Sequence, residues 1–132
     1  MILVDTSVWI EILAGRFRGI GADQFAFIGT CAPILQEVLQ GLRPGPESAE
    51  LRQSMLALPC LCDPLPRRVY VHAAEIFGEG RRRGYTIRSS TDCLIAAISI
   101  ETGAAVWHRD RDYRNIGKFT SLLQFPSSSF PY

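Results

Sequence analysis

Two short runs of apolar residues constrain the fold of this 132-residue chain most strongly. Ile2–Val4 lies at the start and Ala104–Trp107 lies near the end. Unbroken apolar runs of this length are typical of strands that are buried on both faces of a parallel sheet. Because segments with helical periodicity separate them, the sequence predicts an α/β fold, a three-layer α/β/α sandwich with a mainly parallel sheet.

The helical segments are predicted from the spacing of apolar residues and from the residues that begin and end each one. Thr6 or Ser7 is the expected N-cap of the first helix. The helix over 93–101 is apolar on nearly every side, which indicates either a buried helix or a subunit contact. The expected helices cover residues 8–13, 33–42, 47–58, 67–83 and 93–101, and a last edge strand is expected over 119–125.

Composition and cysteine spacing narrow the class of protein. With 47% hydrophobic and 20% charged residues, the chain has the balance of a soluble globular protein. We expect one domain over residues 1–125 and a Ser/Pro-rich C-terminal tail over 126–132. No apolar run is long enough for a membrane span, and no secretory signal is recognised. The four cysteines lack the spacing of a zinc site, so we expect reduced thiols and a cytoplasmic protein.

The charges are unevenly distributed, although the net charge is only +1. Residues 1–66 carry four basic and seven acidic residues, whereas residues 67–118 carry ten basic and six acidic residues. This asymmetry favours a phosphate-binding face, with a solvated helix face as the alternative. The arginines that we expect to bind RNA are Arg82, Arg83, Arg88, Arg109 and Arg111.

Four acids, Asp5, Glu37, Asp92 and Asp110, stand at strand ends or at the margins of apolar helices. Each has an ordinary interpretation alone, since Asp5 and Asp92 suit helix starts and Asp110 suits a turn. If the two strands are parallel neighbours, however, Asp5 and Asp110 share one sheet edge. Clustered carboxylates repel unless a cation or a shared proton is present. An all-oxygen site suits Mg²⁺, with Mn²⁺ as a second candidate.

These residues also carry a family resemblance. The opening MILVDTSVWIE, Glu37 in LQEVLQGL, Asp92 in TDCLIAA and the ending HRDRDY together resemble a PIN-domain ribonuclease, over about residues 1–125. More narrowly, they are similar to the VapC-type toxins of toxin–antitoxin pairs. The resemblance implies a metal-dependent endoribonuclease that cleaves RNA phosphodiester bonds and is inhibited by a cognate antitoxin protein.

Carried over to this sequence, the resemblance implies a role for each acid. Asp5 and Asp92 would be the principal Mg²⁺ ligands, and Glu37 and Asp110 would complete the catalytic and metal-binding set. Ser7 would support it by a hydrogen bond to a carboxylate or a water, and Asp112 is a lesser candidate. We interpret His108, which follows the second strand, as a local contact rather than a metal ligand.

Two other functions remain open from the sequence. One is a phosphotransfer enzyme with a strand-end aspartate nucleophile. It would need a second acid at position 7, where this chain has Ser7. It would also need a lysine near a later strand end, but Lys118 is the only lysine. A catalytically silent PIN-like module would bind RNA or a partner through its arginines. The apolar helix over 93–101 also suggests a homodimer.

Overall fold

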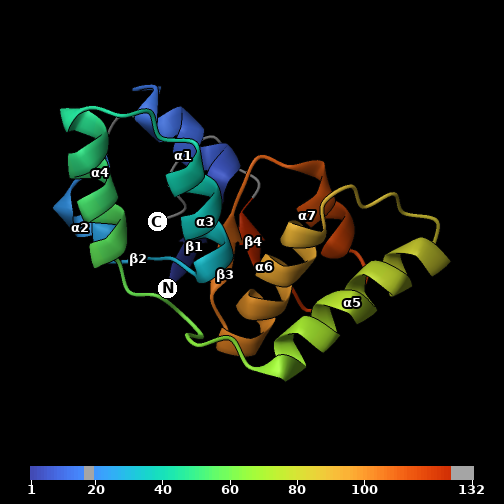
Figure 1. The fold of residues 1–132 in the computed structure, drawn as a ribbon. Helices are drawn as coiled ribbons and strands as arrows, with labels where there is room; N and C mark the ends of the chain where they lie inside the picture. Colours follow the sequence, from blue (N-terminus) through green and yellow to red (C-terminus); the bar gives the residue numbers. More distant parts are fainter. Residues whose placement is uncertain (17–19, 126–132) are drawn as a thin grey trace.

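The computed structural model describes residues 1–16 and 20–125. Its sheet has the order β2–β1–β3–β4, and all three pairings are parallel (Figure 1). The central strands β1, Ile2–Val4, and β3, Ala105–Trp107, are the two apolar runs that the sequence marks as strands. The edges are β2, Ile28–Gly29, and β4, Gln124–Phe125. The α/β fold with a parallel sheet is therefore confirmed.

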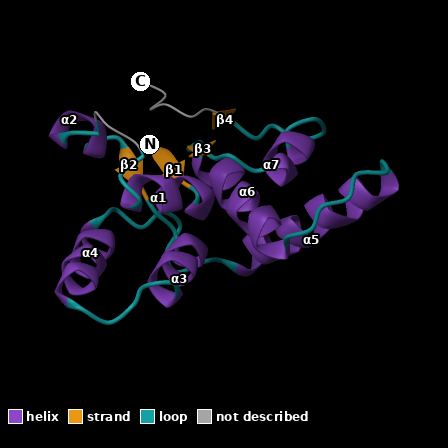
Figure 2. Ribbon diagram, turned by 90° about the horizontal axis from the view of Figure 1, so that it is seen from above, coloured by secondary structure: helices purple, strands orange, loops and turns teal. Residues whose placement is uncertain are grey.

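The central strands are covered on both faces. Successive residues of a strand point to opposite faces, yet Ile2, Leu3 and Val4 are all 0% exposed. In Figure 2, α3, α4, α5 and α6 lie together on one side of the strands, and α2 and α7 lie near opposite edges of the sheet. The helices are α1 (Thr6–Leu13), α2 (Ala22–Phe25), α3 (Ala32–Gln40), α4 (Pro46–Ala57), α5 (Arg67–Arg82), α6 (Ser90–Thr102) and α7 (Arg111–Ile116).

Several expected boundaries are wrong for local reasons. Asp5, rather than Thr6 or Ser7, is the N-cap of α1, because its carboxylate accepts the backbone N–H of Ser7. The expected strand over 119–125 shrinks to β4, since Thr120 folds back to the carbonyl of Ile116. The tail expected over 126–132 lies outside the described residues.

The long helix α6 is buried within the chain. Its residues Ile95 and Ile98 are 0% exposed, and α5 packs along its length. Gly103 ends the helix at a φ of 73°, a left-handed conformation that glycine adopts without strain. Burial against the chain's own elements therefore accounts for the apolar pattern, and the homodimer stays a prediction without support from this helix.

Two further expectations from the sequence concern the state of the cysteines and the absence of a membrane-spanning helix. Cys31, Cys60, Cys62 and Cys93 are all free thiols, in agreement with the interpretation as reduced cysteines. Within the described residues, no helix has both the length and the apolar character needed to cross a bilayer.

The burial of α6 makes a testable prediction. We expect Ile98→Ala to lower the free energy of unfolding by about 2–5 kcal/mol, because it leaves a cavity at a fully buried site. Denaturant unfolding measures this, with Ile10→Ala as the control, since Ile10 is 55% exposed and its loss should cost little. A change in sedimentation without a loss of stability would instead place α6 at a subunit contact.

Candidate active site

The register of β1 and β3 places two of the predicted acids at the same edge of the sheet. Val4 pairs with Trp107, and the backbone N–H of Asp5 donates to the Trp107 carbonyl at 2.9 Å. Asp5 therefore follows β1 where the residues after Trp107 follow β3. These strand ends are carboxyl ends, which is where parallel α/β sheets bind ligands.

The Asp5 carboxylate is buried and held by three donors. It is 4% exposed and accepts the N–H of Ser7 at 3.0 Å, the Ser7 hydroxyl at 2.6 Å and the Tyr113 hydroxyl at 2.8 Å. The Ser7 hydroxyl in turn accepts the backbone N–H of Arg109 at 3.1 Å. Ser7 thus contacts the first acid, as predicted, and also ties α1 to the segment after β3.

Three aspartates from two helices form the tightest acidic group. One carboxylate oxygen of each of Asp92, Asp110 and Asp112 lies within 4.8 Å of the others. Asp92 sits in the first turn of α6, whose N-cap Ser89 accepts its N–H at 3.2 Å. Asp110 caps α7 by accepting the N–H of Asp112 at 2.9 Å. Two helix starts therefore direct these carboxylates to one place.

Unpartnered oxygens in this group fit a cation. Oδ2 of Asp92 and Oδ1 of Asp112 are buried and have no hydrogen-bond partner. The other oxygen of Asp112 accepts the N–H groups of Arg88 and Ser89, both at 3.0 Å. Buried polar atoms without a partner are costly, and oxygen ligands are those that hard divalent cations prefer. The donor set therefore fits Mg²⁺ or Mn²⁺, and Asp112 belongs to it as closely as Asp92 and Asp110.

Glu37 lies at the margin of this arrangement. It projects from α3, is half-buried, and accepts a long hydrogen bond of 3.5 Å from the Thr6 hydroxyl. Burial raises the pKa of Glu37, and the charge of Asp5 raises it further. Glu37 is thus electrostatically linked to Asp5, although it does not belong to the tight aspartate group.

Comparisons with known proteins identify the family of this chain. The family model of the PIN domain matches residues 2–119. The chain is 38% identical over 131 residues to the VapC ribonuclease Mb1587 of Mycobacterium bovis and to ribonuclease VapC11 of Mycobacterium tuberculosis, covering 92% of this chain and 96% of each relative. This chain belongs to the PIN domain family, as a VapC-type member.

Solved structures show the same fold at lower sequence identity. The chain resembles VapBC2 from Rickettsia felis bound to a promoter DNA fragment, with a TM-score of 0.71 and 17% identity, over 95% of this chain and 98% of that one. It also resembles VapBC-5 from Mycobacterium tuberculosis, with a TM-score of 0.66 and 17% identity, over 95% and 97% of the two chains. The three-layer α/β/α sandwich of a PIN domain is therefore the fold of this chain.

Tyr113 is a polar residue of the PIN domain whose role sequence reasoning missed, and it lies beside His108. Tyr113 is fully buried, and its ring lies 4.8 Å, centroid to centroid, from that of His108. Nδ1 of His108 accepts the backbone N–H of Asp110 at 3.0 Å, so the proton sits on Nε2, which donates to Gln124 at 2.8 Å. His108 is a local contact, as predicted. Tyr113 is the last residue of the segment HRDRDY, but the spacing of that segment does not show which of its side chains turn inward.

The predicted RNA-binding arginines come from several elements of the fold. Arg88 and Arg109 lie beside the acids, with Arg88 Nε 3.9 Å from Asp112 Oδ1 and Arg109 Nη1 3.5 Å from Glu11 Oε1. Arg82 and Arg83 lie at the end of α5, and both pair with Glu79 at 2.7 Å. Arg111 is exposed in the first turn of α7. Arg82 and Arg83 therefore have an acidic partner on α5, whereas Arg88 and Arg109 have theirs nearer the predicted site.

Crowding perturbs the proton affinity of Asp92. Burial, together with the charges of Asp5, Asp110 and Asp112, raises the pKa of Asp92 to about 8. Burial likewise raises the pKa of Tyr113 well above its ordinary value, so its hydroxyl remains a donor. Without a cation, the native PIN domain keeps a proton on Asp92 that the unfolded chain would release.

This proton predicts how stability depends on pH. In EDTA, the free energy of unfolding should fall as the pH rises from about 4 to about 8, by up to about 1.4 kcal/mol per pH unit from this group. Asp92→Asn should flatten that decline and stabilise the metal-free protein at neutral pH. Thermal unfolding at a series of pH values measures this decline. The control is Glu75→Gln, because Glu75 is exposed. Equal slopes in wild type and Asp92→Asn would contradict the crowding. Asp5→Asn would be less informative in this test, because the Asp5 carboxylate accepts three hydrogen bonds.

A second prediction concerns His108 as a positioning residue. His108→Leu leaves the N–H of Asp110 without its acceptor, whereas His108→Asn supplies an oxygen that accepts an N–H two residues on. We expect the leucine variant to bind Mg²⁺ about 10–100-fold more weakly and the asparagine variant to recover most of the affinity. The rise in Tm with added Mg²⁺ reports this affinity. Equal losses in both variants would show that only packing of the ring matters.

Proposed function

We propose that this PIN domain is a metal-dependent endoribonuclease that acts as the toxin of a VapBC-type toxin–antitoxin pair. The supporting observation is the convergence of Asp5, Asp92, Asp110 and Asp112 at the carboxyl edge of the sheet, with two carboxylate oxygens left without partners. The relatives at 38% identity bear the name ribonuclease. We assign residues 1–125 to this nuclease domain.

The proposed roles follow from the contacts of each acid. Asp92, Asp110 and Asp112 would hold Mg²⁺, with Mn²⁺ as a substitute, and Asp5 would complete the set with its orientation fixed by Ser7 and Tyr113. A bound divalent cation would activate a water for in-line attack on a phosphodiester and stabilise the leaving oxygen. Glu37, at the margin, has a pKa raised towards the working pH, which suits a group that accepts a proton from water.

Binding of RNA would depend on the cations that flank the acids. Arg88 and Arg109 are exposed, so their guanidinium groups can reach the phosphates on either side of the cleaved bond. Specificity in such a site would come from loop shape and from unpaired segments of RNA. An RNA substrate and four free thiols support a cytoplasmic location.

A protein partner is part of the proposal. Solved neighbours carry the names of two-protein complexes, VapBC and FitAB, which supports a cognate antitoxin for this chain. The acidic edge would be its target of inhibition, because a basic side chain placed there would neutralise the carboxylates as a cation does.

The decisive experiment compares RNA cleavage by wild type and Asp92→Ala. We expect cleavage that requires Mg²⁺, is lost in EDTA, and falls by more than about 100-fold in the variant, since even the outer partners of metal ligands change activity by roughly 10–100-fold. Glu75→Ala, which removes an exposed acid on α5, should retain full activity. If Asp92→Ala instead keeps its activity and loses only about 0.3–1 kcal/mol of stability, the acid merely stabilises the first turn of α6. RNA binding without turnover would indicate the silent PIN-like module.

A further inference from the structure

Basic and aromatic side chains gather at the C-terminal end of α5, on a part of the chain that the proposed chemistry does not use. They come from the last turns of α5, from the segment that follows it, and from the segment after α7. We name this group the basic–aromatic cluster, and its members are Phe77, Arg81, Arg82, Arg83, Tyr85, Lys118 and Phe119.

Three of the four cations in the cluster lie over an aromatic ring. The Arg81 guanidinium carbon is 5.0 Å from the centroid of Phe77, and Lys118 Nζ is 5.2 Å from that of Tyr85. Arg83 lies 5.8 Å from the ring of Phe119, which itself stacks on Tyr85 at 5.8 Å and 14°. Cation–π contacts of this kind hold the charged groups near ring faces, so the cluster presents charge and aromatic surface together.

The cluster keeps a positive charge after its internal ion pairs are counted. Glu79 pairs with both Arg82 and Arg83. Arg81 and Lys118 form no ion pair with any residue among 1–16 and 20–125. The cations available to an anionic ligand are therefore Arg81 and Lys118.

The cluster is also close to the acids along the chain. Arg88 and Ser89 donate their N–H groups to Asp112, and Tyr85 precedes Arg88 by only three residues. Three residues span at most about 11 Å, so Tyr85 lies within a few nucleotides of the acidic group. An RNA strand held at the acids would have neighbouring phosphates within reach of Arg81 and Lys118.

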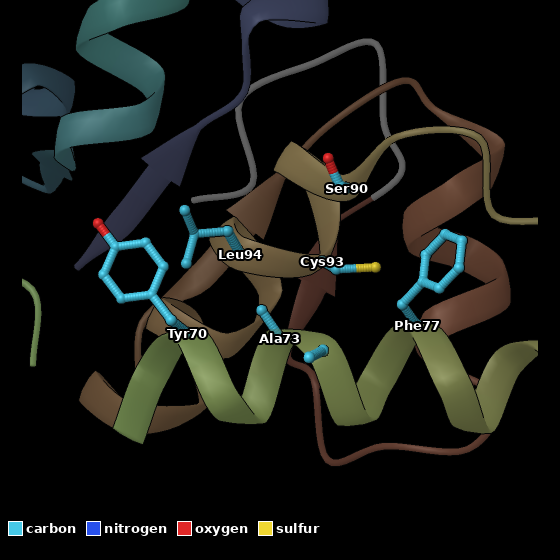
Figure 3. Close-up of a pocket in the computed structure, with 7 residues that line it drawn as sticks. Tyr70, Ala73, Phe77, Ser90, Cys93 and Leu94 are labelled. Atoms are coloured by element: carbon cyan, nitrogen blue, oxygen red, sulfur yellow. The ribbon is translucent and has the colours of Figure 1, made fainter. Parts of the chain in front are cut away.

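Three hollows lie along α5 between the basic–aromatic cluster and Glu37. A hollow of about 200 Å³ lies against Phe77, Arg81 and Tyr85. The next, of about 430 Å³, lies between α5 and α6, where the rings of Phe77 and Tyr70 stand at its two ends (Figure 3). A third, of about 380 Å³, shares Tyr70 with the second and is lined by Glu37. Aromatic rings therefore recur between the acids and the basic–aromatic cluster.

We propose that the basic–aromatic cluster is an RNA-docking site that holds the substrate strand a few nucleotides from the bond to be cleaved. Arg81 and Lys118 contact phosphates, and the aromatic faces of the cluster offer stacking surface to bases. Sites that bind single-stranded RNA combine these two features, because phosphates need cations and every base has a π face. This docking site rests on the proposed ribonuclease function and adds a second, separate contact for its substrate.

The test is a double variant, Arg81→Ala with Lys118→Ala, measured for binding in EDTA so that cleavage plays no part. The probe is a fluorescein-labelled 20-nucleotide polyuridine, followed by anisotropy over a range of salt concentrations. We expect Kd to rise about tenfold and the slope of log K against log salt to fall by about 1.4, because each lost phosphate contact contributes about 0.7 for a single strand. The control is Arg43→Ala with Arg52→Ala, which removes the same charge from exposed sites near α4.

The outcomes separate this proposal from the ribonuclease function. Equal Kd values and slopes in the two double variants overturn the docking site, and so does a wild type that fails to bind the probe. Cleavage of RNA by wild type in Mg²⁺ is scored separately, so activity with equal slopes would overturn the docking site alone. Binding that depends on the cluster without any cleavage would overturn the nuclease and retain the docking site. Loss of a protein partner with unchanged RNA binding would identify a protein-binding surface instead and contradict the proposal.

Discussion

Repulsion among buried carboxylates is the constraint on which the site depends. Asp5, Asp92 and Asp112 are each at most 6% exposed, and Asp110 lies beside them. Like charges in such a place cost free energy unless donors, protons or cations offset them. The protein supplies donors to Asp5 and to one oxygen of Asp112 but leaves Oδ2 of Asp92 and Oδ1 of Asp112 without a hydrogen-bond partner. The remaining cost is what a divalent cation would relieve.

The donors that reduce this repulsion come from elements that are far apart in the sequence. Ser7 on α1 joins Asp5 to the segment after β3, and Tyr113 on α7 reaches back to Asp5. His108 orients the backbone of Asp110 and is itself held by Gln124 of β4. The geometry of the acids is therefore a property of the whole sheet edge, and the edge strand β4 contributes to it although it carries no acid.

The parts of the fold that follow from one-dimensional patterns could be predicted from the sequence. Ile2–Val4 and Ala105–Trp107 are buried strands because their apolar runs have no polar face, and the acids that follow them share one edge because the strands are parallel neighbours. The family was recognisable from the residues around those acids, and the comparisons confirm it.

The elements that could not be predicted are those made by tertiary contacts. Strand β2 has two residues, Ile28 and Gly29, which is too short to produce a periodic pattern. Helix α7 begins in HRDRDY, where the abundance of charge suggests a turn, and only Asp110 capping the N–H of Asp112 shows a helix start. Asp112 received a lesser role for the same reason, because its neighbours Arg88 and Ser89 are more than twenty residues away in the chain.

Negative and positive charges lie in different parts of the molecule. A phosphodiester and the four carboxylates have the same sign, so RNA approaches the acidic edge against repulsion unless positive charge surrounds it. A net charge of +1 hides this arrangement, since the acids occupy the sheet edge while Arg88, Arg109 and the end of α5 carry cations around it. Positive charge at several points raises the local concentration of an anionic strand before it reaches the acids. A bound divalent cation would offset the repulsion that remains among Asp92, Asp110 and Asp112.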